Sequence, residues 1–230
     1  MLARVERLGK HVPTDGERRI PRTTTLGGQP TRRAALRGAA AGIVGLTAIR
    51  RTNESHAAEN LGSFGRVPTI DQIRSADPSY WLLVDLINDY RGRLGLPKIA
   101  LSPRLTVVAA LHVRDLATRA PHADGASLHS WSRDERWSGG QYKPTDKSSW
   151  TIMWDKPKEI VGYPGYGFEI AAARVRDARY ALEAWQKSPQ HSNVMLNRDT
   201  WADDRWQWKA IGAAFFQGFA CAWFGDLADG

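Results

Sequence analysis

Cysteine is nearly absent from the chain. Its 230 residues include one cysteine, Cys221, so no disulfide can form within the chain. The sequence also lacks a Cys-x-x-Cys pair, the His-Glu-x-x-His pattern of many zinc peptidases and a glycine-rich phosphate loop. The Gly-x-Ser-x-Gly turn that presents a nucleophilic serine is missing too. These absences exclude a disulfide-stapled fold and argue against nucleotide-binding and serine-hydrolase functions.

Long apolar runs and a basic body are missing as well. A mildly apolar stretch at residues 38–49 has 12 residues, whereas a helix needs about 20 to span a bilayer. We therefore expect no integral membrane span. Residues 1–57 hold 11 Lys and Arg against 4 Asp and Glu, but residues 58–230 hold 21 against 20. Because the body is nearly neutral, the net charge of +8 does not indicate a nucleic-acid-binding protein.

The basic leader, residues 1–57, is similar to a twin-arginine export signal. Arg32-Arg33 precedes the apolar stretch, and Ser55-His56-Ala57 then offers small residues of the kind that a signal peptidase reads. We expect cleavage after Ala57 and export to the periplasm or the medium. The alternative is a disordered basic tail on a cytoplasmic protein.

The first part of the body contains two clear helix starts. Residues 58–76 are expected to form an irregular lead-in, and residues 77–230 a single domain. Asp77-Pro78 and Ser102-Pro103 each combine an N-capping side chain with proline at the first helical position. Apolar residues follow both at helical spacing and predict two helices, the first of which ends at Gly95.

The second part mixes loops, helices and strands. Residues 120–168 are rich in Gly, Ser, Asp, Pro and Trp, and we expect short strands within this long stretch. A third helix is predicted at about 172–187, and Ser188-Pro189 begins a short fourth helix. Two almost continuously apolar strands at 209–216 and 219–224 form a predicted hairpin. The elements predict an α+β domain of three layers, whose sheet is covered on both faces.

Two histidines and one glutamate are the candidate site residues. His129 lies in a polar stretch, and His191 lies in the first turn of the predicted fourth helix, where a neutral imidazole is favoured. Glu169 lies between two apolar residues, so a buried carboxylate there needs a histidine or a metal as partner. The alternatives are a surface histidine at position 191 and a solvent-facing strand position at 169. His112, on an apolar helical stripe, is expected to be a satisfied core histidine.

Several motifs occur in an order that resembles a known family. In chain order they are Asn88-x-x-Arg91, Leu94-Gly95-Leu96-Pro97, Ser102-x-x-Leu105, the segments of His129 and Glu169, and Trp185-x-x-Ser188-Pro189-x-His191. Their spacing resembles the CAP superfamily, which comprises cysteine-rich secretory, antigen 5 and pathogenesis-related proteins. The resemblance covers about residues 80–225, and two further stretches, 153–157 and 163–169, are similar to a bacterial and algal branch.

The resemblance implies an α-β-α sandwich with a mostly antiparallel central sheet. It also implies a cleft lined by two histidines, here His129 and His191, and by two acidic residues. In several family members the two histidines bind a divalent metal such as zinc. Glu169 matches the first acid, but Gln186-Lys187 occupy the place of the second, for which Glu183 is the expected substitute.

The function implied by the resemblance is that of an exported interaction module rather than an enzyme. Its ligand would be a small apolar or cell-envelope molecule. The alternative is a metal-dependent hydrolase, in which His129 and His191 hold the metal and Glu169 acts as general base. Glu169 could instead only orient a histidine. A third interpretation is saccharide binding by tryptophans that otherwise cover the sheet: Trp201, Trp206 and Trp208.

Overall fold

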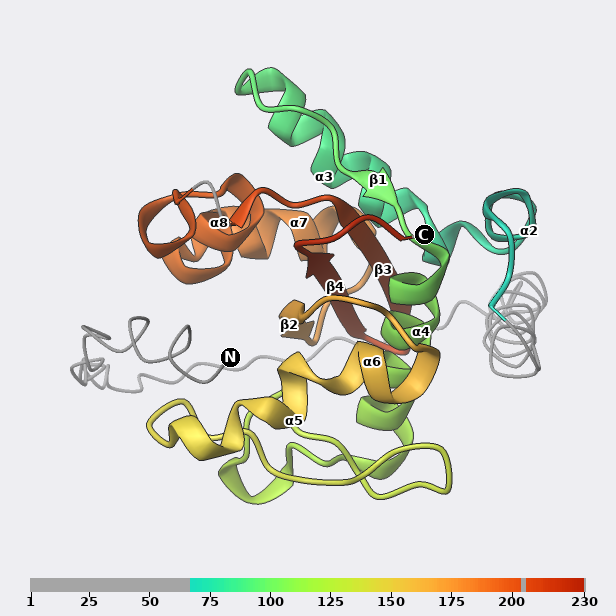
Figure 1. Ribbon diagram of the computed structural model, residues 1–230, viewed down its shortest axis with the longest axis vertical. Coiled ribbons are helices and arrows are strands. Elements are labelled where there is room, and N and C mark those ends of the chain that lie inside the picture. Colours follow the sequence, from blue (N-terminus) through green and yellow to red (C-terminus); the bar gives the residue numbers. More distant parts are fainter. Residues whose placement is uncertain (1–66, 204–205, 230) are drawn as a thin grey trace, which may run out of the picture. The chain divides into compact units, whose positions relative to one another are not determined.

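The computed structural model describes residues 67–203 and 206–229 (Figure 1). The leader at 1–57, with its expected cleavage site, lies outside the described residues, and so does the lead-in as far as residue 66. The rest of the lead-in is not irregular, because it contains helix α2 (Ile70–Ser75). A reciprocal cap explains this helix: Gln72 donates its backbone N–H to Thr69 Oγ1, and Thr69 donates its own to Gln72 Oε1.

One predicted helix start is confirmed and the other lies a few residues too early. Asp77 accepts the Ser79 backbone N–H at 2.8 Å, but Asp77-Pro78 begins a 3₁₀ turn, η3 (Pro78–Tyr80), and helix α3 (Leu82–Arg93) follows it. Ser102 Oγ accepts the Leu105 backbone N–H at 3.0 Å at the start of helix α4 (Pro103–Arg119). Gly95 follows α3 with φ of +74°, a left-handed conformation that glycine adopts without strain.

The described strands form one four-stranded sheet, in the order β1-β3-β4-β2. Their bounds are β1 (Ala100–Leu101), β2 (Gly167–Ala173), β3 (Ala210–Phe216) and β4 (Phe219–Gly225). β1 runs parallel to β3, while the β3–β4 and β4–β2 pairs are antiparallel. The predicted hairpin and the mostly antiparallel sheet are thus confirmed. In the register, Glu169 lies opposite Trp223, and Cys221 lies two residues away on the same face.

Residues 120–168 differ from the prediction of short strands. Within them the structure has η4 (Ala123–Gly125), η5 (Lys147–Ser149), α5 (Thr151–Trp154) and α6 (Lys156–Val161). Apart from the first residues of β2, extended pairing is limited to isolated bridges such as Trp131–Gly140. Side-chain caps such as Asp146, which accepts the Ser148 backbone N–H at 3.0 Å, hold the segment in short helical turns instead.

The third and fourth helices follow β2. Helix α7 (Ala178–Lys187) starts later than predicted, because Ala172 and Ala173 still pair with β4 and because Asp177 caps the helix. Helix α8 (Pro189–Leu196) begins where predicted and is followed by η6 (Asp199–Trp201).

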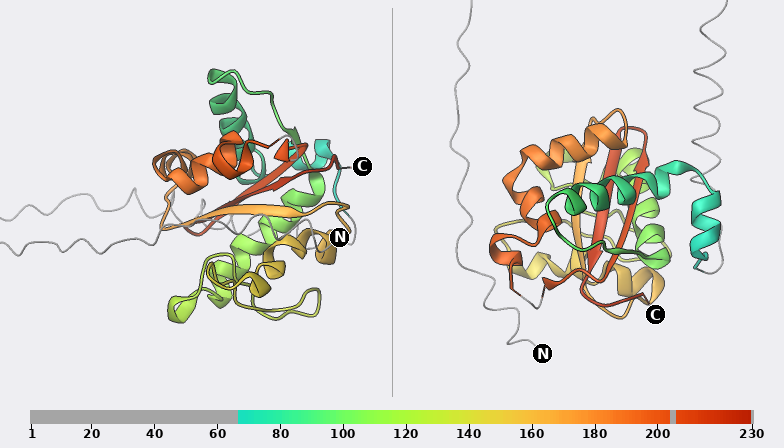
Figure 2. Two further views of the ribbon diagram at one scale, coloured as in Figure 1. Left: turned by 60° about the vertical axis from the view of Figure 1, so that its left-hand side comes forward. Right: turned by 90° about the horizontal axis from the view of Figure 1, so that it is seen from above.

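The layers are visible in Figure 2, with the sheet in the middle. Helices α3, α7 and α8 cover one face, and α4, α5 and α6 lie on the other. The α+β sandwich with a sheet covered on both faces is therefore confirmed. No helix among residues 67–203 and 206–229 is long and apolar enough to cross a membrane.

Candidate functional site

Glu169 is a buried carboxylate on the edge strand β2. Its side chain has no exposed surface, and both of its oxygen atoms have histidine partners. Oε1 lies 2.5 Å from Nδ1 of His112, and Oε2 lies 2.8 Å from Nδ1 of His129. The expectation that a carboxylate buried at this position needs a histidine partner is confirmed.

His112 is the partner that the sequence did not reveal. Helix α4 carries it against the sheet, where its side chain is completely buried. Its Nε2 lies 3.2 Å from the backbone carbonyl of Ser130, and its ring stacks on Trp131 with centroids 4.1 Å apart. It is a satisfied core histidine, as its place on an apolar stripe predicts. That place gave no sign that its partner would be Glu169, because this contact depends on how α4 packs on the sheet.

His129 lies beside the carboxylate but reaches the surface. It belongs to the loop after α4, and 19% of its side chain is exposed. The Tyr142 ring packs edge-on against it at 5.1 Å. An ionised Glu169 can only accept hydrogen bonds, so His129 donates its Nδ1–H. In the neutral form of the ring, Nε2 keeps its lone pair and is the nitrogen that can bind a metal or a proton.

His191 comes from the opposite layer of the sandwich, in the first turn of α8. Burial, and to a lesser extent the positive charge of His129, lower the pKa of His191 to about 4, while the charge of Glu169 opposes this. The ring is therefore neutral at pH 7. The charges of His129 and Glu169 thus both act on His191, while the direct contact among the three predicted residues is the hydrogen bond between Glu169 and His129. Glu183 is exposed on α7, and within the described part of the chain no hydrogen bond or ion pair joins it to them.

The electrostatic balance keeps Glu169 ionised. Burial alone would raise the pKa of its carboxyl group. The charge and hydrogen bond of His112, followed by those of His129, outweigh burial and hold the pKa below its usual value. Cys221 lies on the same face of the sheet, and burial together with the charge of Glu169 raises the pKa of its thiol well above normal. Cys221 is therefore an uncharged thiol, as its apolar surroundings predict.

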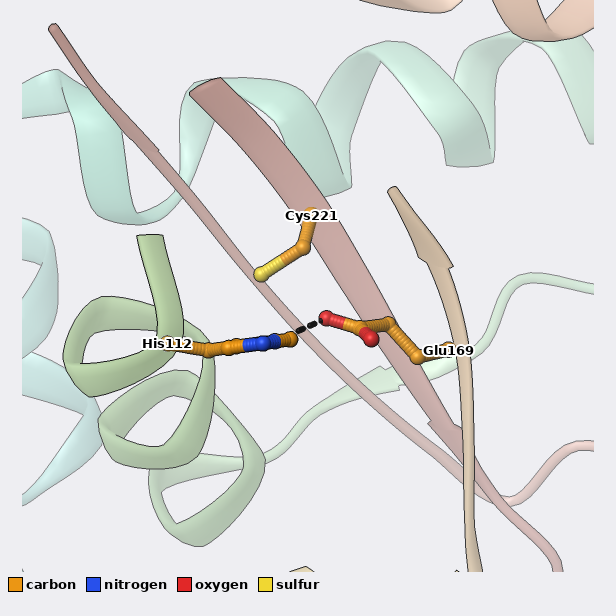
Figure 3. Close-up of side chains that lie close together, drawn as sticks. All are labelled: His112, Glu169 and Cys221. Carbon is orange, nitrogen blue, oxygen red and sulfur yellow. Dashed lines mark hydrogen bonds and ion pairs between the residues drawn. The ribbon is translucent and has the colours of Figure 1, made fainter. Parts of the chain in front are cut away.

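Two groups of side chains have the chemistry of metal ligands. In the first of them the distance between two ligand atoms is too short for a metal ion. His112, Glu169 and Cys221 point toward one another between α4 and the sheet, with ligand atoms within 4.8 Å (Figure 3). Two ligand atoms of a tetrahedral zinc ion lie roughly 3.3 Å apart, given bonds of about 2.0 Å. The His112–Glu169 distance of 2.5 Å is too short for that and is that of a hydrogen bond.

The second group, His129 and His191, consists of two imidazoles, which are common ligands of divalent metals such as zinc, and burial keeps the His191 ring neutral at pH 7. Glu169 holds the other nitrogen of His129, which is the usual arrangement of a carboxylate behind a metal-binding histidine. These are the residues predicted from the sequence as metal ligands.

Comparison with known proteins identifies the family. A sequence model of the cysteine-rich secretory protein family, CAP, matches residues 84–201, which is just over half of the chain. The chain belongs to the CAP family. The matched region contains all the histidines and the glutamate of the site, and the resemblance inferred from the motifs is confirmed.

Solved structures of bacterial CAP proteins are also similar. A cysteine-rich secretory protein of Staphylococcus aureus is 13% identical, with a TM-score of 0.42, over 64% of this chain and 37% of its own. An extracellular protein containing an SCP domain from Bacillus anthracis is 21% identical, with a TM-score of 0.45, over 69% of this chain and 44% of its own. The CAP chain described here thus spans less than half of either protein. No curated protein matches it.

Proposed function

We propose that this CAP protein is an exported binding module whose site takes up a divalent metal through His129 and His191. The observation that carries the proposal is the Glu169–His129 hydrogen bond of 2.8 Å. It leaves Nε2 of His129 as an acceptor beside a second, neutral imidazole. When bound, a metal such as zinc would supply a Lewis-acidic centre for an oxygen of the ligand.

The burial of Glu169 favours a binding module over a hydrolase. A general base has to reach a water molecule or the substrate. The Glu169 side chain is completely buried, and both oxygens are engaged by histidines. Its role in this proposal is therefore to orient His129.

Export and the ligand class are parts of the same proposal. The twin-arginine-like leader supports export, and so does the description of the similar B. anthracis protein as extracellular. The ligand that we propose is a small apolar or cell-envelope molecule. Saccharide binding by the C-terminal tryptophans receives less support, because these rings pack on Phe168 at 5.0 to 5.3 Å and cover the sheet. They are Trp201, Trp206 and Trp208.

Zinc titration calorimetry of the full chain tests the proposal. We expect one binding event in the wild type and none in a His129→Ala/His191→Ala double variant. His122→Ala is the matched control, since His122 packs on Phe219, away from the site, and this variant should bind zinc as the wild type does. Equal heats for the wild type and the double variant would refute metal binding at these residues.

A further inference from the structure

The proposed site does not account for His112, which is buried and contacts both Glu169, the hydrogen-bond partner of His129, and Ser130, the next residue in the chain. We propose that His112 is a positioning residue that fixes which nitrogen of His129 carries the proton. This inference rests on the proposed function, in which Nε2 of His129 is a metal ligand. In this inference the buried His112 keeps Nε2 of His129 unprotonated.

His112 itself carries a proton on its Nε2. The backbone carbonyl of Ser130 can only accept a hydrogen bond, so Nε2 of His112 carries a proton and donates it over 3.2 Å. Nδ1 then either donates to Glu169 as part of an imidazolium or accepts a proton from a neutral carboxyl group. In both cases one proton lies between Nδ1 and Oε1, across the 2.5 Å contact.

The other oxygen of Glu169, Oε2, acts as a hydrogen-bond acceptor. Since the proton of the His112–Glu169 pair lies at Oε1, Oε2 carries none. Oε2 can therefore only accept, and its 2.8 Å partner, Nδ1 of His129, has to donate. The direction of one buried hydrogen bond thus sets the direction of the next, and Nε2 of His129 is left with its lone pair.

Removal of His112 would make this direction ambiguous. Oε1 of Glu169 would lose its 2.5 Å partner while Oε2 kept its contact with His129, so the proton between Glu169 and His129 could lie on either atom of that contact. On Oε2 that proton would donate to Nδ1 of His129. The proton of His129 would then lie on Nε2, where it blocks a metal.

His112 also holds the backbone beside His129. The carbonyl that it binds belongs to Ser130, the next residue in the chain, and its ring stacks nearly parallel to Trp131, at an interplanar angle of 8°. Ser130 is completely buried, and its hydroxyl accepts the backbone N–H of Tyr142. One side chain therefore fixes the carboxylate behind His129 and the chain on which His129 is carried.

Nitrogen NMR of the histidine rings tests the inference without any metal. In the ¹⁵N-labelled full chain with chelator at pH 7, long-range ¹H–¹⁵N spectra should show His129 as the Nδ1–H tautomer. In His112→Leu we expect a shift toward the Nε2–H form. His112→Asn, which keeps an N–H near the position of Nδ1, should restore the wild-type tautomer at least in part. His122→Asn, outside the network, should leave the His129 signals unchanged.

Zinc affinity provides a second measurement. Loss of an outer-shell partner weakens metal binding about 10-fold or more, and we expect this of His112→Leu, with a smaller loss in His112→Asn. A wild-type His129 found as the Nε2–H tautomer overturns the inference by itself, even if His112→Leu does not fold. A folded His112→Leu with wild-type tautomer and wild-type zinc affinity overturns it too.

The two proposals fail in distinguishable ways. If the wild type binds no zinc while His112→Leu changes the His129 tautomer, the proposed function is wrong and the role of His112 stands. If the wild type and His112→Leu bind zinc equally and share one tautomer, the metal site stands and the role of His112 is wrong.

Discussion

At the scale of single residues, the site depends on groups that are costly to bury. A charged carboxylate such as that of Glu169 loses several kcal/mol of hydration when it is buried, and its two histidine partners have to offset this loss. His191 meets the same constraint differently, since it is partly buried and stays in the neutral form at pH 7. Both residues therefore have pKa values below their ordinary values, so the folded chain takes up protons at these two groups less readily than the unfolded chain.

The lowered pKa of His191 predicts a loss of stability in acid. Its pKa is about 4 in the folded chain, compared with an ordinary value of 6.5. Between pH 6.5 and 4 the unfolded chain therefore binds a proton at His191 that the folded chain does not bind. Stability therefore falls as the pH decreases from 6.5 toward 4, by about 2 to 3 kcal/mol at pH 4.5. Urea unfolding with chelator should show a smaller decrease between pH 7 and 4.5 in His191→Gln. The same decrease in both proteins would contradict the lowered pKa.

At the scale of elements, the sequence predicts best the starts that depend on neighbouring residues. Helices α4 and α8 begin at their Ser-Pro pairs because a proline at the first helical position acts locally. The start of α7 could not be predicted in this way. Ala172 and Ala173 favour a helix by themselves, but their pairing with Ala220 and Phe219 places them in β2. That pairing joins residues far apart in the chain.

The contact of α4 with β3 predicts opposite effects for the same substitution at two glycines. A Cβ on Gly212 would lie 2.1 Å from the Thr106 backbone nitrogen and 2.2 Å from the Leu105 carbonyl carbon. Because helix backbone cannot move aside cheaply, Gly212→Ala should destabilise by about 3 kcal/mol or more. Gly92, inside α3, has open space, and Gly92→Ala should stabilise by about 0.5–1 kcal/mol.

Urea unfolding followed by tryptophan fluorescence measures both variants. The contrast between them removes any general effect of exchanging glycine for alanine. A Gly212→Ala protein as stable as the wild type would show that α4 and β3 do not approach as closely as described.

At the scale of the whole molecule, convergence is what the residues alone could not predict. His129, Glu169 and His191 come from a loop, an edge strand and a helix of the opposite layer. That they share one cleft is what the family resemblance predicts. The role of His112 needed the structure, since it depends on the register that places Glu169 on the face covered by α4. Glu183 shows the limit of carrying a family position to a neighbouring residue: it lies on the exposed side of α7.

In the layer that carries His191, the buried side chain of Arg91 joins helix α3 to the end of helix α8. Arg91 of α3 donates to the Met195 carbonyl at 2.5 Å and to Asn197 Oδ1 at 2.9 Å, at the end of α8. Its Nε also donates to the Pro97 carbonyl, and only 2% of the residue is exposed. Burial lowers the pKa of Arg91 to about 10, so it is still charged at pH 7. The planar guanidinium reaches three acceptors that belong to two segments far apart in the chain.

Arg91→Lys should therefore destabilise the protein although it keeps the charge. A lysine amine cannot match the fork of the guanidinium, and buried acceptors without donors cost about 1–3 kcal/mol each, so we expect a loss of about 3 kcal/mol in urea unfolding. Arg93→Lys is the matched control on the same helix: Arg93 is exposed, and its change should stay within about 0.5 kcal/mol. Equal losses in the two variants would mean that Arg91 does not join α3 to α8. A loss confined to Arg91→Lys would show that the contact between these helices depends on the shape of the guanidinium as well as on its charge.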